Sequence, residues 1–224
     1  MNISIEQLER IALTALEKSY EIHQKLGISG EELIQKNQFG ETALRIDIEA
    51  EKTIIDVLTE ANVPIRIISE EHGTIEISNN PIYLGVLDGL DGSNVYKKER
   101  GKGRYGTMFG IFSNLDPEYS DFIFSGVMEH STKRLFYAVN GKGCFLIDNG
   151  KTRIKCSNCK ILNKNTNIYV DEFFDKAFNT TFIYETYLSK LGGYKLLHGN
   201  SSAVHYVDLA SGKADLVLEC TAKR

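Results

Sequence analysis

The stretch that decides the fold is Tyr83-Leu-Gly-Val-Leu-Asp-Gly-Leu-Asp-Gly-Ser-Asn94, in which an apolar run leads into two carboxylates three residues apart. The apolar run predicts a strand. Gly89 and Gly92 permit a tight turn and close approach of a ligand, so both carboxylates can point at one place. Because two convergent carboxylates repel each other, Asp88 and Asp91 indicate a cation site.

The donors around this predicted cation site are all oxygens: the Asp88 and Asp91 carboxylates, the Leu90 carbonyl and the Ser93 hydroxyl. Oxygen-only sites favour Mg²⁺, Mn²⁺ or Ca²⁺ over Zn²⁺. We therefore expect Mg²⁺, with Mn²⁺ as a substitute. The alternative is a solvated turn, because Asp, Gly and Ser are common turn residues, and the run by itself does not decide between the two.

Two further carboxylates come from the preceding part of the chain. The segment Ile67-Ile-Ser-Glu-Glu-His-Gly73 follows a short apolar strand and can bring Glu70 to the same sheet edge as Asp88. Asp47 stands near the start of a helical period that stops before Pro64. A carboxylate at that position favours the positive end of the helix dipole.

A phosphate site is expected beside the cation site. If a helix begins just after Gly92, the amides of Gly92, Ser93 and Asn94 are available to an anion and are reinforced by the helix dipole. Metal and phosphate then meet at one place.

The rest of the chain predicts helices layered on sheets. Apolar residues recur at helical spacing from Ile5 to Leu26, and Asn149-Gly150 favours a tight hairpin between two strand-like pieces. The chain shows no long linker, so we do not divide it into independent domains. The other predicted strands are 65–68, 83–87, 107–112, 122–127, 135–139, 168–170, 194–197 and 214–218, with further helices over 173–190 and 202–211.

Composition narrows the class of protein. A chain of 224 residues with 42% hydrophobic content can bury a substantial core. Its formal charge of -4, with interspersed signs, leaves no basic stripe for nucleic acid. We expect a cytoplasmic protein without membrane association, because no apolar run approaches the length of a bilayer span. One Cys156-Ser-Asn-Cys159 pair does not supply the four ligands of a zinc site, so reduced thiols are expected.

The ordered carboxylates resemble the inositol monophosphatase and fructose-1,6-bisphosphatase superfamily. The pattern of that family is a strand followed by Asp-Pro-Ile/Leu-Asp-Gly-Thr/Ser, with an upstream Glu-Glu. The resemblance spans nearly the whole chain and includes Gly126-Val-Met-Glu129, the hairpin region 135–146, and Ser201-Ser-Ala-Val with the following 209–219. It implies an α+β fold, the layered αβαβα sandwich of the sugar phosphatases.

The resemblance also implies the domain organisation and the partners. It implies one phosphatase domain over 1–224, made of two packed subdomains at about 1–155 and about 156–224. A homodimer is implied as well, with a small phosphorylated metabolite as the partner that the site binds.

The resemblance assigns a role to each candidate site residue. Asp47 and Ser93 would partner each other and polarise a metal-bound water that attacks phosphorus in line. Two or three magnesium ions would neutralise the phosphate and the leaving oxygen. The implied sets are Asp47 and Ser93 for catalysis, Glu70, Asp88, Leu90 and Asp91 for metal, Gly92, Ser93 and Asn94 for phosphate, and Asp91, Ser202 and Glu219 for substrate hydroxyls.

The implied reaction is magnesium-dependent hydrolysis of a phosphomonoester of a small polyol or sugar. Inositol monophosphate is the first expected substrate. Fructose-1,6-bisphosphate is the second, and 3′-phosphoadenosine 5′-phosphate is a distant third.

The sequence departs from the family pattern in three places, and two of them, Gly89 and the end of the chain, keep a non-enzyme alternative open. Gly89 replaces the usual proline between the aspartates, and Ser93 replaces the commoner threonine but keeps its hydroxyl. The segment Cys220-Thr-Ala-Lys-Arg224 stops where the family continues into another aspartate, so we expect the sequence to be a fragment. The alternative is a catalytically silent module that binds phosphate or metal in a regulatory role.

Overall fold

The computed structural model describes residues 3–36, 40, 42–99, 103–170, 188–191, 193–197 and 201–218. Its α-helices are α1 (Ile5–Leu26), α2 (Arg45–Glu60), α3 (Ser93–Glu99) and α5 (Ser202–Ala210). Short 3-10 helices cover Gly27–Glu31, Tyr119–Asp121 and Leu188–Leu191. The strands are β1 (Leu33–Lys36), β2 (Thr42–Leu44), β3 (Ile65–Ser69), β4 (Gly73–Glu76), β5 (Tyr83–Asp91), β6 (Gly106–Phe112), β7 (Phe122–Glu129), β8 (Arg134–Val139), β9 (Gly143–Ile147), β10 (Lys151–Ile154), β11 (Asn167–Val170), β12 (Lys195–Leu197) and β13 (Leu216–Leu218).

Helix α1 begins where a capping box defines its first turn. The Gln7 amide donates to the Ser4 hydroxyl at 3.2 Å, and the Ser4 amide donates to the Gln7 side chain at 2.8 Å. These two bonds satisfy donors that a helix start leaves open. The helix ends before Gly27, so the predicted range from Ile5 to Leu26 is confirmed.

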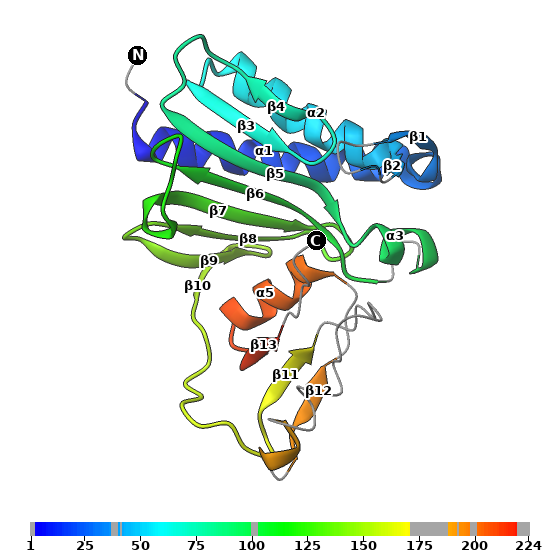
Figure 1. Ribbon diagram of the computed structural model, residues 1–224, viewed down its shortest axis with the longest axis vertical. Helices are drawn as coiled ribbons and strands as arrows, with labels where there is room; N and C mark the ends of the chain where they lie inside the picture. The colour runs from blue at the N-terminus through cyan, green and yellow to red at the C-terminus, as the bar shows by residue number, and fades with distance from the viewer. Residues whose placement is uncertain are drawn as a thin grey trace.

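The eight-stranded sheet has the order β10-β9-β8-β7-β6-β5-β3-β4 and crosses the centre of the molecule (Figure 1). Its neighbouring strands are antiparallel except for β3 and β5, which run in parallel. Parallel neighbours end at the same edge of a sheet. The segments that follow β3 and β5 are therefore brought side by side.

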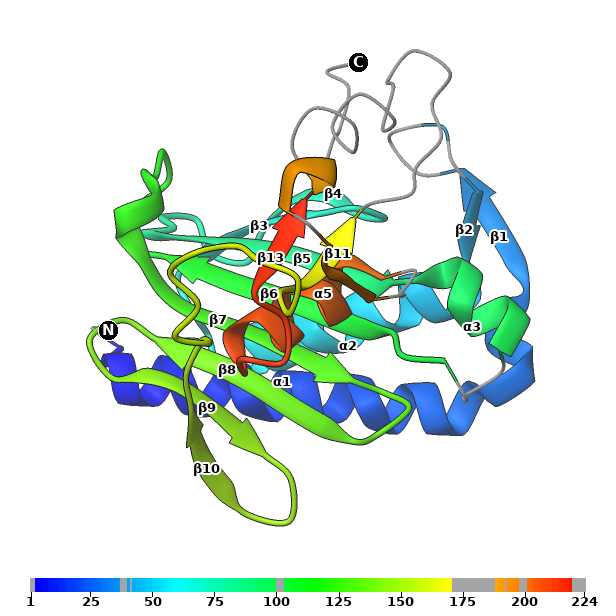
Figure 2. The same cartoon turned by 90° about the horizontal axis from the view of Figure 1, so that it is seen from below.

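Helices α1 and α2 cover one face of this sheet, as Figure 2 shows. Leu16 of α1 and Ile54 of α2 are fully buried against strand residues such as Ile67, Phe109 and Phe124. Burying a large apolar side chain stabilises by about 1.5–3 kcal/mol. This contact between the helix pair and the sheet forms the larger of the hydrophobic clusters in the described residues.

Most predicted strands are confirmed with small shifts at their ends. The predicted hairpin lies between β9 and β10, where Asn149 and Gly150 both have positive φ, 54° and 151°. The sequence did not predict β1, β2 or β4. These strands are short, and the side chains of β4 alternate only between partly exposed and exposed, so no clear buried face marks it.

Strand β5 differs from its prediction at the carboxylates. The expected end was Leu87, yet the strand continues to Asp91 and contains the carboxylates. Asp88 pairs with Met108 and Asp91 with Gly106, so two residues of β5 stand opposite one residue of β6. The acidic run is therefore a β-bulge within a strand, which bends the strand and re-aims its side chains.

Helix α5 lies between the large sheet and a small parallel sheet of order β12-β11-β13 (Figure 1). The described residues thus form helix, sheet, helix and sheet layers. The predicted helix over 173–190 falls mostly in 171–187, outside the described residues. The large sheet ends at Ile154 and the small sheet begins at Asn167, on either side of the boundary near 155. The subdomain division itself stays a prediction.

Two further features bear on the sequence predictions, namely the state of the cysteines and the character of the helices. Cys156 and Cys159 are exposed and form no disulfide among the described residues, and their reduced state stays a prediction. Within the part of the chain that the structure describes, no helix has the length and apolar character of a membrane span.

Candidate metal and phosphate site

The site forms at the edge where β3 and β5 end together. Ser69 is in register with Leu87, and the Glu70 amide donates to the Leu87 carbonyl at 3.3 Å. Glu70 and Asp88 therefore follow paired positions of two parallel strands. The prediction that Glu70 reaches the same sheet edge as Asp88 is confirmed.

Asp88 lies in an electrostatic environment that disfavours its charge. Burial raises the pKa of its carboxyl well above the ordinary 3.8, and the negative charges of Glu70, Asp91 and Asp47 raise it further. One of its oxygens accepts a hydrogen bond from the Leu90 amide at 2.9 Å, which acts in the opposite direction. The predicted carboxylates therefore repel one another, which a bound cation would relieve.

Asp47 lies in the first turn of α2 and is buried. Burial raises its pKa to about 7; the Leu44 amide, which donates to Asp47 at 2.9 Å, opposes that rise, and the charges of Glu71, Glu70 and Glu51 add to it. A carboxyl with such a pKa can exchange a proton near neutral pH. No hydrogen bond links Asp47 to Ser93 in the described residues, so their partnership stays a prediction.

Glu51 is a site residue that the sequence analysis missed. Its side chain is fully buried and accepts hydrogen bonds from the Ser69 hydroxyl and, at 3.1 Å each, from the Glu70 and Glu71 amides. The His72 ring lies 2.9 Å from the same carboxylate. Glu51 thus holds the turn that carries Glu70. The available signal was its spacing, four residues after Asp47 on one helical face.

The predicted phosphate residues lie at the start of α3, which begins at Ser93 directly after Gly92. Gly92 has a φ of 97°, a conformation that favours glycine. Its carbonyl accepts hydrogen bonds from the amides of Val95 at 2.9 Å and Tyr96 at 3.0 Å. Ser93 is partly exposed and Asn94 is exposed. The expected helix start is confirmed, whereas phosphate binding there stays a prediction.

Asp91 joins the acidic bulge to α5. Its carboxylate accepts hydrogen bonds from the Ser201 hydroxyl and, at 2.8 Å, from the Ala203 amide. Ser202, the first residue of α5, is partly exposed next to this contact. The structure therefore brings one predicted substrate residue close to Asp91. Glu219, the other, lies outside the described residues.

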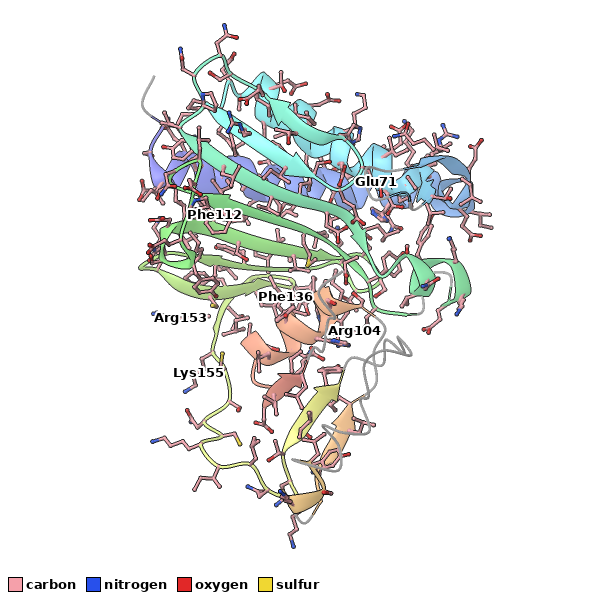
Figure 3. The ribbon with its side chains drawn as sticks, viewed as in Figure 1. Glu71, Arg104, Phe112, Phe136, Arg153 and Lys155 are labelled. Atoms are coloured by element: carbon pink, nitrogen blue, oxygen red, sulfur yellow. The ribbon has the colours of Figure 1, made fainter. Side chains whose placement is uncertain are left out.

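A second network missed from the sequence anchors α5 farther along the helix. Arg104, which lies beside α5 in Figure 3, donates to Glu129 at 2.7 and 3.0 Å and to Asp208 of α5 at 2.7 and 2.9 Å. The Tyr169 hydroxyl donates to Asp208 at 2.9 Å. Glu129 and Asp208 are 1% and 4% exposed, so this is a buried ionic link between the large sheet, α5 and the small sheet.

The donor chemistry of the site fits a hard divalent cation, because its groups are carboxylate and carbonyl oxygens. Burial raises the pKa of both Asp47 and Asp88, and the charge of Glu70 adds to the rise at each carboxyl. Among the described residues, however, no group of three or more His, Cys, Asp or Glu side chains is arranged as a complete ligand set. Asp88 and Asp91 accept hydrogen bonds from backbone amides instead.

The layers of helices and sheets together define an α+β protein with the layered fold of the sugar phosphatases. A family model described as the inositol monophosphatase family matches residues 2–224, and the chain belongs to this family. A curated relative, the fructose-1,6-bisphosphatase/inositol-1-monophosphatase of Methanothermobacter thermautotrophicus, is 29% identical over 122 residues. That match covers 51% of this chain and 43% of the relative, so it spans less than half of the relative's length.

Solved structures agree with the fold. The extragenic suppressor protein SuhB from Bartonella henselae superposes with a TM-score of 0.76 at 16% identity, covering 96% of this chain and 78% of that one. An IMPase/NADP phosphatase complexed with NADP and Ca²⁺ gives 0.75 at 16% identity, covering 100% and 78%. At these identities the two structures bear on the fold alone. The expected layered fold is confirmed.

Proposed function

We propose that the protein is a magnesium-dependent phosphomonoesterase for a small phosphorylated polyol or sugar, with inositol monophosphate as its first substrate. The observation that carries the proposal is the acidic strand edge, where burial raises the pKa of Asp88 and the charges of Glu70, Asp91 and Asp47 raise it further. Fructose-1,6-bisphosphate is the alternative substrate, supported by the name of the curated relative.

Mg²⁺, when bound, would neutralise the phosphate charge and make a bound water more acidic. Two or three ions are proposed, held by Glu70, Asp88, Asp91 and the Leu90 carbonyl, and Mn²⁺ is a suitable substitute. The IMPase/NADP phosphatase of the same fold was solved in complex with Ca²⁺, which supports a divalent cation.

The residues of the chain itself have separate tasks in this proposal. Asp47, with a pKa of about 7, takes the proton of the attacking water. The Ser93 hydroxyl orients that water. The amides at the start of α3 have no partner within the helix and can donate to phosphate oxygens. Asp91 and the start of α5 hold the substrate hydroxyls, with Ser202 and Glu219 as further contacts.

A phosphate-release assay on the protein from the complete open reading frame tests the proposal. Inositol 1-phosphate, fructose-1,6-bisphosphate and 3′-phosphoadenosine 5′-phosphate are compared with Mg²⁺, with Mn²⁺ and with a chelator. We expect metal-dependent release, fastest with inositol 1-phosphate. Release that is equal with metal and with chelator, or no release from any phosphomonoester, contradicts the proposal.

A second candidate is a silent module that binds metal or phosphate without turnover. It is favoured by one observation, that the described acidic side chains do not form a complete ligand set. In that case Mn²⁺ binding, measured by electron paramagnetic resonance, persists while no substrate is hydrolysed. We propose a homodimer for both candidate functions, and light scattering on the purified protein tests this oligomeric state.

A further inference from the structure

The Gly89 carbonyl lies inside the bulge in β5. Between the pairs Asp88–Met108 and Asp91–Gly106, Gly89 and Leu90 of β5 stand opposite the single residue Thr107 of β6. A bulge interrupts the regular ladder of hydrogen bonds. Gly89 is buried, so its carbonyl needs a donor from the protein.

The side chain of Thr107 supplies that donor. Its hydroxyl donates to the Gly89 carbonyl at 2.7 Å, and Thr107 is fully buried. The Nε2 atom of His130 lies 2.8 Å from the same hydroxyl oxygen. A threonine hydroxyl has one hydrogen, which goes to Gly89, so Nε2 of His130 is the donor in the second contact. His130 thereby fixes the direction in which the Thr107 hydroxyl points.

The ring of His130 is itself held in place. It is 2% exposed and stacks on the ring of His23 from α1, with centroids 3.4 Å apart and an angle of 19° between the planes. The His130 amide also donates to the Tyr105 carbonyl at 3.0 Å. The hydroxyl of Thr107 therefore contacts a buried ring that is stacked against α1.

Helix α2 closes the opposite side of Gly89. A Cβ atom at this position would collide with the Asp47 carbonyl and would lie 2.8 Å from Cγ of Glu51. Gly89 allows the bulge to pack directly against α2. Because glycine has no side chain, however, it does not by itself restrict the backbone φ and ψ angles at this position. Its peptide is restrained by what surrounds it, namely α2 on one side and Thr107 on the other.

We propose that Thr107 is a positioning residue for the metal site: its hydroxyl, directed by His130, fixes the Gly89–Leu90 peptide between the ligands Asp88 and Asp91. The inference rests on the proposed function, because it takes these residues and the Leu90 carbonyl as ligands. Loss of the hydroxyl removes the hydrogen bond that Thr107 donates to the Gly89 carbonyl, and the Leu90 carbonyl, one peptide further on, is then held less firmly.

The test compares Thr107→Val, which keeps the shape but lacks the hydroxyl, with Thr107→Ser, which keeps the hydroxyl. The control is Thr166→Val, since Thr166 is also buried and its hydroxyl accepts a hydrogen bond from the Asn163 amide, in a loop before β11. Affinity for Mn²⁺ is measured from the free-ion electron paramagnetic resonance signal, which does not depend on turnover. Thermal unfolding in chelator reports on folding.

We expect Thr107→Val to weaken Mn²⁺ binding about tenfold, the effect of losing one buried hydrogen bond. Thr107→Ser should stay within about threefold of the parent, and Thr166→Val should bind as the parent does even if it is less stable. If Thr107→Val does not fold, His130→Phe keeps an aromatic ring, removes the donor and should weaken binding in the same direction.

Two results overturn the inference, and they differ from failure of the proposed function. Unchanged Mn²⁺ affinity in folded Thr107→Val removes any positioning role. Equal weakening in Thr107→Ser and Thr107→Val shows that packing, and not the hydroxyl, decides affinity. If the parent protein binds no Mn²⁺, the metal site and the inference fall together, whereas Mn²⁺ binding without hydrolysis overturns only the catalytic proposal.

Discussion

The carboxylate of Asp91 accepts a hydrogen bond from the backbone amide of Ala203 at 2.8 Å, across 112 residues of sequence. Ala203 is the second residue of α5, so a side chain of the acidic bulge caps a distant helix. Such a contact satisfies an open amide and favours the positive end of the helix dipole. Asp91 therefore has a structural task that Asp88 does not share.

The two neighbouring aspartates should respond in opposite ways to neutralisation. Asp88→Asn removes one charge from a repelling cluster, so the metal-free protein should become more stable. Asp91→Asn also removes a charge from this cluster, but it weakens the cap on α5, whose loss of about 1 kcal/mol should outweigh that relief. Both variants should lose at least about a hundredfold in metal-dependent activity. Urea unfolding in chelator, with phosphate release measured in parallel, checks this.

The matched control for both variants is Asp148→Asn. Asp148 pairs with Arg134 of β8, the third strand along from β5 in the large sheet, and both side chains are about one-third exposed, 34% and 36%. Its neutralisation should change stability by less than about 1 kcal/mol and leave activity unchanged. Equal destabilisation by Asp88→Asn and Asp91→Asn would contradict the separate roles.

Glu51 should matter for stability and metal affinity without touching the metal. The two carboxylate oxygens of Glu51 accept hydrogen bonds from the Glu70 and Glu71 amides. Glu51→Gln replaces one of these oxygens by an NH₂ group, which cannot accept, so the free energy of unfolding should fall by about 2 kcal/mol. The turn at Glu70 then loosens, so more Mg²⁺ should be needed for half-maximal activity. Glu60→Gln, at the exposed end of the same helix, is the control. An unchanged Mg²⁺ requirement would show that Glu51 does not orient Glu70.

Arg104 should hold α5 against the large sheet. Arg104→Met leaves the buried Glu129 carboxylate without this cation and leaves Asp208 with Lys213 at 3.5 Å, so it should destabilise by about 3 kcal/mol. Arg104→Lys keeps the charge but not the forked geometry, so its loss should be smaller. Because α5 carries Ser202, KM should rise more than kcat falls. Arg134→Met, which breaks a partly exposed pair, is the control, and equal losses in the two Met variants would exclude the anchoring role.

Mg²⁺ should stabilise the protein more at pH 8 than at pH 5. The folded-state pKa of Asp47 is raised to about 7 and that of Asp88 is raised too, so the metal-free folded protein binds more protons than the unfolded chain. Its stability therefore falls as pH rises from the ordinary carboxyl pKa near 4 through about 7. Mg²⁺ replaces those protons and removes the repulsion above this range.

Thermal unfolding at pH 5, 6, 7 and 8, with and without Mg²⁺, measures this dependence. Burial lowers the pKa of His23 to about 3 and that of His130 well below its ordinary value, so these rings stay neutral in the folded protein. They reduce stability as pH falls through the unfolded histidine pKa near 6.5. That slope is the same with and without Mg²⁺ and cancels in the difference. An Mg²⁺ effect that is equal at pH 5 and pH 8 would refute the carboxylate origin.

The sequence alone predicted the elements whose signals are local. Helix α1 follows from apolar residues at helical spacing and from its terminal chemistry, and the β9–β10 hairpin follows from Asn149-Gly150. The side-by-side placement of Glu70 and Asp88 was also predictable, because each follows an apolar strand. The helix start at Ser93 came from the position of Gly92.

Only the tertiary structure decided how those pieces are held together. The bulge in β5 depends on the pairing of β5 with β6, and no local sequence pattern predicts that pairing. Three single polar residues, Glu51, Thr107 and Arg104, have roles that depend on hydrogen-bond partners 18 to 104 residues away in the sequence. Their sequence neighbourhoods would suit an exposed position equally well. Local sequence therefore determined which acidic groups reach the strand edge, while long-range burial determined what fixes them there, since buried polar groups need partners that folding alone supplies.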